Sequence, residues 1–283
     1  MVNTIGIGFS RTGSTWLSRC LEEHPEICFS KEKETHFFNL DARFNEGVDS
    51  YHSYFDCGDE KVVAEFTAVY TRDSEKVAER IHAYNPKTKL LVMLRNPADR
   101  AFSNYIYRKS RVGGYESFEK AVEENDQIVQ EGLYAKHLAP FFELFPIEQF
   151  IFVVQEESRK NPKETIQEVY GELGIDSQFI PSCIGREVNA SKDHAYKLPW
   201  LQHAIQRTRM AVHKSKLLGP IRNLVKFFGV TKIISNVQKA NEAKGEAKEE
   251  MLESTRSKLL KYYAEDIQSL EEKTGLNLDI WKR

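Results

Sequence analysis

The stretch Gly8-Phe9-Ser10-Arg11-Thr12-Gly13-Ser14-Thr15 decides the fold. It follows an apolar run at residues 4–9 and leads into a helical pattern at Thr15–His24, which Pro25 ends. Its two glycines have the spacing of a phosphate-binding P-loop placed between a strand and a helix. Backbone N–H groups in such a turn, together with the N-terminus of the helix, form a concave site for an anion. The sequence therefore predicts a strand, a phosphate loop and a helix in that order.

Strand and helix patterns continue to alternate after this unit. Further strands are predicted at residues 61–66, Lys89–Leu94 and Gln149–Val154. Helices are predicted from Asp73 or Ser74 to about Tyr84, from Asn96-Pro97 to about Lys109, over Ser117–Phe145, and from Asn161-Pro162 to Gly174. Strands as apolar as Lys89–Leu94 are usually buried on both faces, as in a parallel sheet covered by helices. We therefore expect an α/β fold with a P-loop-type parallel sheet flanked by helices.

The strand signals weaken after about Asp193, and the pattern becomes helical. The last expected helix, at about Glu249–Lys273, has its apolar residues on one stripe. No repeat or Pro/Gly-rich linker separates the two parts of the sequence. We therefore expect residues 1–283 to form a single domain, with an α/β core at residues 1–192 and a helical C-terminal extension at residues 193–283.

Composition limits the class of protein and its partners. A hydrophobic fraction of 41% and a charged fraction of 29% are ordinary for a soluble globular protein. The formal net charge of -2 argues against attraction of the whole protein to nucleic acid, so we expect no nucleic-acid partner. The first residues lack a signal-peptide pattern, and no stretch reaches the roughly 20 apolar residues of a membrane span. We therefore expect a cytoplasmic protein.

The four cysteines are irregularly spaced and include no C-x-x-C pair; they are Cys20, Cys28, Cys57 and Cys183. This pattern favours reduced thiols over a disulfide framework or a zinc site.

The sequence differs from that of a magnesium-dependent nucleoside triphosphatase. Ser14 stands where such an enzyme has its lysine, and the positive charge lies three residues earlier, at Arg11. The strand Lys89–Leu94 runs into Arg95, where a triphosphatase commonly has a metal-binding aspartate. This pattern favours a nucleotide whose phosphates are neutralised by side chains, and we expect no metal.

Two segments resemble the nucleotide motifs of sulfotransferases. Arg11–Leu17 resembles their 5′-phosphosulfate loop, and Leu94-Arg95-Asn96-Pro97-Ala98-Asp99-Arg100-Ala101-Phe102-Ser103-Asn104-Tyr105 resembles their 3′-phosphate motif. The similarity is to heparan-sulfate-type sulfotransferases and their bacterial counterparts, over roughly residues 3–190. It implies sulfuryl transfer from 3′-phosphoadenosine 5′-phosphosulfate (PAPS) to a hydroxyl or amine. The implied donor-binding residues are Arg11, Thr12, Gly13, Ser14, Thr15, Trp16, Arg95 and Ser103, and Lys192 is added because it follows the last strand. For Arg95, a surface ion pair with Asp99 is the alternative.

The resemblance also implies chemical roles. Lys33-Glu34-Thr35-His36-Phe37-Phe38 is similar to a family segment whose Glu is the general base, so Glu34 is the expected base and His36 its orienting partner or the alternative base. Arg11 is expected to stabilise charge on the leaving phosphate. Gly132–Leu138 resembles a segment beside the acceptor cleft, which makes Tyr134 and His137 candidates for acceptor binding, with a structural role as the alternative.

Two departures from the family affect the chemistry. The family usually has Lys where this chain has Arg11, and its Gly-Glu-x-Ser-Pro-x-Tyr segment is here Ala64–Tyr70.

The acceptor remains open between carbohydrate and lipid, among others. The stretch 197–239 is basic, with no Asp or Glu, and is either a helical lid with a solvated basic face or a contact for a membrane or an acidic acceptor. The alternative functions are a P-loop small-molecule kinase and a catalytically inactive nucleotide-binding module.

Overall fold

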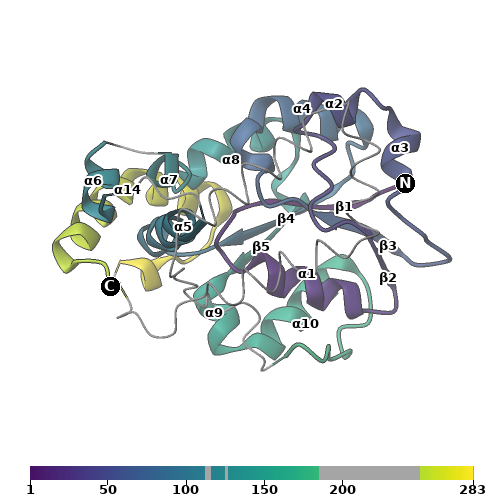
Figure 1. The fold of residues 1–283 in the computed structure, drawn as a ribbon. Coiled ribbons are helices and arrows are strands. Elements are labelled where there is room, and N and C mark those ends of the chain that lie inside the picture. The colour runs from purple at the N-terminus through teal and green to yellow at the C-terminus, as the bar shows by residue number, and fades with distance from the viewer. Residues whose placement is uncertain (112–115, 125–126, 185–248, 283) are drawn as a thin grey trace, which may run out of the picture.

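The computed structural model describes residues 1–111, 116–124, 127–184 and 249–282, and its centre is a five-stranded parallel sheet (Figure 1). The strands are β1 (Thr4–Gly8), β2 (Ile27–Phe29), β3 (Val62–Phe66), β4 (Lys89–Leu94) and β5 (Phe150–Val154). Their order is β2-β3-β1-β4-β5, and every neighbouring pair is parallel. The predicted α/β class and parallel sheet are confirmed.

Helices cover both faces of this sheet (Figure 1). Ile5, Leu90 and Val92 pack into the core on the side of α4 (Ser74–Tyr84) and α8 (Tyr134–Leu144). Leu91, Met93, Ile151 and Val153 pack on the opposite side, that of α1 (Ser14–Glu23) and α10 (Pro162–Leu173). Because successive residues of a strand point to opposite faces, this double burial explains the nearly continuous apolar strands.

The helix ends follow the expected capping signals at two places. The Asn96 side chain accepts hydrogen bonds from the N–H groups of Ala98 and Asp99 and so begins α5 (Pro97–Arg111). Gly174 ends α10 in a left-handed conformation. The expected long helical region at Ser117–Phe145 is instead divided into α6 (Phe118–Glu123), α7 (Gln127–Gln130) and α8. The short elements β2, α2 (Asp41–Phe44), α3 (Val48–His52) and α9 (Gln155–Lys160) were not predicted, because they are too short to show a periodicity.

The C-terminal helix α14 (Glu253–Thr274) shares a core with the sheet, through Leu259, Tyr263, Ile267 and Leu270. It packs against α5 and α8. Lys192 and the basic stretch 197–239 lie outside the described residues, so the division near residue 192 stays a prediction. In the part of the chain that the structure describes, no helix combines the length and the apolar character of a membrane span.

The reduced-thiol prediction is wrong for one pair of cysteines. Cys28 of β2 and Cys57 form a disulfide, whereas Cys20 and Cys183 are free and buried. Parallel pairing of Cys28 with Val63 brings β2 beside the chain that leads into β3, and this proximity has no signature in the cysteine spacing. Both sulfurs of the disulfide are bonded to each other, so the nearby Glu60 does not complete a metal site with them.

The disulfide predicts a measurable stability difference. The double variant Cys28→Ser/Cys57→Ser should be less stable by about 2–4 kcal/mol, because the unfolded chain loses the constraint of a loop with a sequence separation of 29. Urea unfolding of both proteins measures the difference. Reductant should lower the stability of the wild type toward that of the variant and leave the variant unchanged; equal stability of the two oxidised proteins would contradict the pairing.

Candidate functional site

The phosphate loop between β1 and α1 closely approaches β4 and the first residue of α9 at Gly13. This glycine has a φ of 100°, and a Cβ atom added to it would lie 2.8 Å from Met93 Cε and 2.9 Å from Gln155 Nε2. The Thr12 hydroxyl donates to the carbonyl oxygen of Phe9 at 2.6 Å and closes the turn. At position 13, the positive φ and the close contacts of an added Cβ both require glycine. The first turn of an α-helix leaves N–H groups that have no acceptor within the helix, and such groups bind anions.

Three of the expected donor-binding residues come together beside this loop. Arg11 Nε donates to Ser103 Oγ of α5 at 3.3 Å. Arg95, at the end of β4, donates from Nη1 to the backbone oxygen of Arg11 at 3.2 Å. The Arg11 guanidinium also lies 4.6 Å from the centre of the Tyr107 ring. Burial lowers the pKa of Arg95, and the charge of Asp99 opposes that shift.

The alternative role of Arg95, an ion pair with Asp99, does not describe its hydrogen bonding. Both carboxylate oxygens of Asp99 bind Arg256 of α14, at 2.6 and 3.1 Å. The Arg95 side chain donates instead to the backbone oxygen of Arg11, and the backbone next to Arg95 is held by Glu156. Asn96 N–H donates to Glu156 Oε1 at 2.9 Å, and Trp281 Nε1 donates to Glu156 Oε2 at 3.1 Å.

Tyr134 contacts the backbone of Arg95. It is fully buried, and its hydroxyl donates to the backbone oxygen of Arg95 at 2.7 Å. Its ring packs against Phe9, with 4.5 Å between the ring centres. The expectation that Tyr134 contacts the acceptor is therefore replaced by a structural role in holding Arg95.

The expected base lies on a strained segment at the edge of the loop. Glu34 and His36 have φ angles of 63° and 54°, in the left-handed region that non-glycine residues rarely adopt. Their side chains are 3.7 Å apart, from Glu34 Oε2 to His36 Nε2, and each is about one-third exposed. The preceding residue, Lys33, donates from Nζ to Thr15 Oγ1 at 2.5 Å, so the segment touches the first turn of α1.

A buried carboxylate holds the segment Glu34–His36 in place through Thr35. Glu65 of β3 is fully buried and accepts hydrogen bonds from four hydroxyl groups, those of Thr35, Tyr51, Thr67 and Tyr70. Burial raises the pKa of Glu65, and the four donors oppose that shift. Because Thr35 lies between Glu34 and His36, its bond to Glu65 at 2.9 Å fixes the backbone that carries both.

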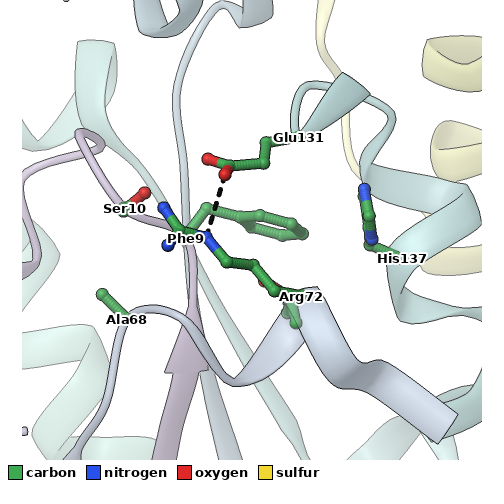
Figure 2. A pocket seen from close by; sticks show the side chains of 7 residues that line it. Phe9, Ser10, Ala68, Arg72, Glu131 and His137 are labelled. Carbon is green, nitrogen blue, oxygen red and sulfur yellow. Dashed lines mark ion pairs between the residues drawn. The ribbon is translucent and has the colours of Figure 1, made fainter. Parts of the chain in front are cut away.

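A small cavity lies between the loop and α8 and is lined by Phe9, Ser10, Ala68, Thr71, Arg72, Glu131 and His137 (Figure 2). Figure 2 shows Arg72 paired with Glu131, a contact of 2.9 Å. Arg100 also donates to Glu131, at 3.2 Å from the other oxygen. Burial lowers the pKa of His137, whose Nε2 lies 3.2 Å from the backbone oxygen of Gln130. Of the two residues proposed to bind the acceptor, His137 alone lines this cavity.

Strain marks the same residues that the sequence assigned to catalysis. Among the described residues, the non-glycine positions with a positive φ are Arg11, Glu34 and His36. Each such conformation costs about 1–3 kcal/mol and tends to occur at functional sites. Arg11, Arg95 and Ser103 form a cationic and polar cluster beside the loop, with the carboxylate of Glu34 at its edge.

Several residues of the site had no role assigned from sequence. Lys33 and Glu65 are within quoted motifs, but their contacts depend on how the segments fold together. Glu65 could have been noticed as a carboxylate within the mostly apolar strand predicted at residues 61–66. No pattern in the sequence indicated a role for Arg72 or Glu131. Lys192, expected over the 3′-phosphate, lies outside the described residues.

Comparison with known proteins identifies the class. Residues 3–218 match the sulfotransferase domain family, and the chain belongs to this family. It is 32% identical over 180 residues to human heparan sulfate glucosamine 3-O-sulfotransferase 6, covering 60% of this chain and 51% of the relative. It is 32% identical over 179 residues to mouse heparan sulfate glucosamine 3-O-sulfotransferase 3A1, covering 60% and 44%. The chain thus spans about half the length of these curated relatives.

The fold is similar to that of a solved bacterial structure. A sulfotransferase from Alicyclobacillus acidocaldarius matches with a TM-score of 0.69 and 22% identity, covering 100% of this chain and 99% of that chain. This likeness supports the fold, which is that of the sulfotransferase family.

The loop geometry predicts that Gly13→Ala is more destabilising than a matched glycine change. Gly13→Ala should cost about 2–5 kcal/mol, because left-handed strain adds to the close contacts with Met93 and Gln155. Gly174→Ala, at a φ of 79° with open space around it, should cost only the strain, about 1–2 kcal/mol. Urea unfolding measures both, and equal losses would show that the loop is not packed as described.

Proposed function

We propose that this protein is an enzyme that transfers a sulfuryl group from PAPS to a carbohydrate hydroxyl. The observation that carries the proposal is the convergence of Arg11, Arg95 and Ser103 on the glycine loop, with Glu34 at its edge. A guanidinium at a strand end suits recognition of a phosphate in a fixed geometry. Membership of the sulfotransferase family supports the same donor chemistry.

The residues divide the reaction into three roles. The loop N–H groups and Arg11 bind the 5′-phosphosulfate, and Arg95 with Ser103 binds the 3′-phosphate. Glu34 removes the proton of the acceptor hydroxyl as its oxygen attacks sulfur, and His36 orients Glu34. Charge that develops on the departing phosphate is stabilised by the cationic side chains around the loop. We expect no metal in this scheme.

Two other functions are less well supported. A P-loop kinase would need the lysine that Ser14 replaces, and Arg95 follows β4 where a metal-binding aspartate is common. An inactive nucleotide-binding module would not need the strained backbone at Glu34 and His36. A carbohydrate acceptor is proposed from the curated relatives, whose names specify heparan sulfate glucosamine.

The cytoplasmic location stays a proposal. The disulfide between Cys28 and Cys57 is of a kind that persists mainly in oxidising compartments, which argues against that proposal. Fractionation of cells that express the protein, with thiol trapping of Cys28 and Cys57, decides between the two compartments.

The assignment of Arg95 predicts discrimination between two nucleotides that differ only in the 3′-phosphate. By calorimetry in EDTA, the wild type should bind 3′-phosphoadenosine 5′-phosphate (PAP) more tightly than AMP. Arg95→Ala should lose about 10- to 100-fold in PAP affinity and little in AMP affinity, because a charge-assisted contact to the 3′-phosphate is lost. Arg159→Ala, an exposed arginine nearby on α9, is the control. Preference for ATP with Mg²⁺ would favour the kinase.

The assignment of Glu34 as base predicts a change in turnover without a change in donor binding. With PAPS and heparan sulfate as the test acceptor, Glu34→Gln should lower kcat by about 10²–10⁴-fold and leave PAP affinity unchanged. Glu32→Gln is a matched control, because Glu32 is exposed and pairs with Arg43 at 3.0 Å. Retention of kcat in Glu34→Gln would transfer the role of base to another group, with His36→Gln as the next variant.

A further inference from the structure

The ammonium of Lys33 lies at a position that a P-loop normally gives to a metal ion. In a loop of the pattern G-x-x-x-x-G-K-[ST], the final hydroxyl ligates Mg²⁺. Gly8 and Gly13 align this chain with that pattern, and Thr15 occupies the position of the final hydroxyl. Its Oγ1 accepts a hydrogen bond from Lys33 Nζ at 2.5 Å. The hydroxyl that would hold a metal is therefore bound by a side-chain cation.

Arg11 contacts α5, whereas Lys33 contacts the Thr15 hydroxyl. Its guanidinium donates to Ser103 and lies over the Tyr107 ring, on the α5 side of the loop. Lys33 reaches the loop from the segment after β2, which also carries Glu34. Burial lowers the pKa of Lys33, and the neighbouring Glu34 opposes the shift. Lys33 is an exposed residue on a long side chain, so its ammonium can move onto an anion that enters beside Thr15.

We propose that Lys33 replaces both the missing loop lysine and the magnesium ion, and that it binds the 5′-phosphosulfate of the donor. This inference rests on the proposed function. In the transfer step, the acceptor oxygen forms a bond to sulfur and the bond between sulfur and the bridging oxygen breaks. The electron pair of that bond stays on the departing phosphate, and the acceptor proton goes to Glu34. Lys33 remains protonated and donates a hydrogen bond to the phosphate oxygen that gains charge.

The test compares two nucleotides that differ only in the 5′-phosphate, and it needs no acceptor. Lys33→Ala should lower the affinity for PAP by about 10- to 100-fold and leave the affinity for adenosine 3′-monophosphate unchanged. Lys31→Ala removes the same charge two residues away, where Lys31 pairs with the exposed Asp56, and should change neither affinity. Wild-type PAP affinity should be the same in EDTA and in Mg²⁺, because the cation is part of the chain.

The outcomes separate this inference from the function on which it rests. Equal losses for both nucleotides in Lys33→Ala, or no loss for either, would overturn it, as would a wild-type affinity for PAP that falls in EDTA. Lys33→Gln, which keeps the length of the side chain, should behave as Lys33→Ala does; full PAP affinity in Lys33→Gln would show that the charge is not needed. If the wild type does not prefer PAP to AMP, the proposed function itself fails, whatever the Lys33 variants do.

Discussion

The close approach of the phosphate loop to Met93 of β4 and Gln155 of α9 at Gly13 is the constraint on which the site depends. Because Gly13 has no side chain, the loop packs against Met93 and Gln155, and α1 begins at the next residue, Ser14. This position places the Arg11 backbone oxygen within reach of Arg95 and the Arg11 side chain within reach of Ser103. The same position lets Lys33 reach Thr15 from the segment after β2. A wider turn would separate all of these contacts.

Buried polar groups hold the segment Glu34–His36 in a conformation that its residues would not adopt alone. Glu65 has four hydroxyl partners, and one of them, Thr35, lies between two residues with positive φ. A buried carboxylate is costly unless it is well hydrogen-bonded, so the network has few alternative arrangements. Tyr134 and Glu156 have a comparable role at the other motif, because they bind the backbone around Arg95. Rigid support of this kind is what positioning for group transfer requires.

The sequence predicted most of the longer strands and helices, but not the contacts made between distant segments. β4 was predicted with its observed bounds, because its residues form a nearly continuous apolar run. In the structure, five of its six residues are buried. The disulfide, the pairing of Asp99 with Arg256 and the burial of Tyr134 all depend on segments far apart in the chain. Lys33 was part of a recognised segment, yet its contact with Thr15 follows from the position of β2 at the edge of the sheet. Local patterns therefore located the site, and tertiary packing determined which side chains enter it.

A crystal structure of the protein with PAP, grown in the presence of Mg²⁺, tests the central claim most directly. We expect the 3′-phosphate on Arg95 and Ser103, the 5′-phosphate in the loop at Gly13, and Lys33 Nζ within hydrogen-bonding distance of that 5′-phosphate. A magnesium ion on the Thr15 hydroxyl, with Lys33 displaced from the loop, would contradict it.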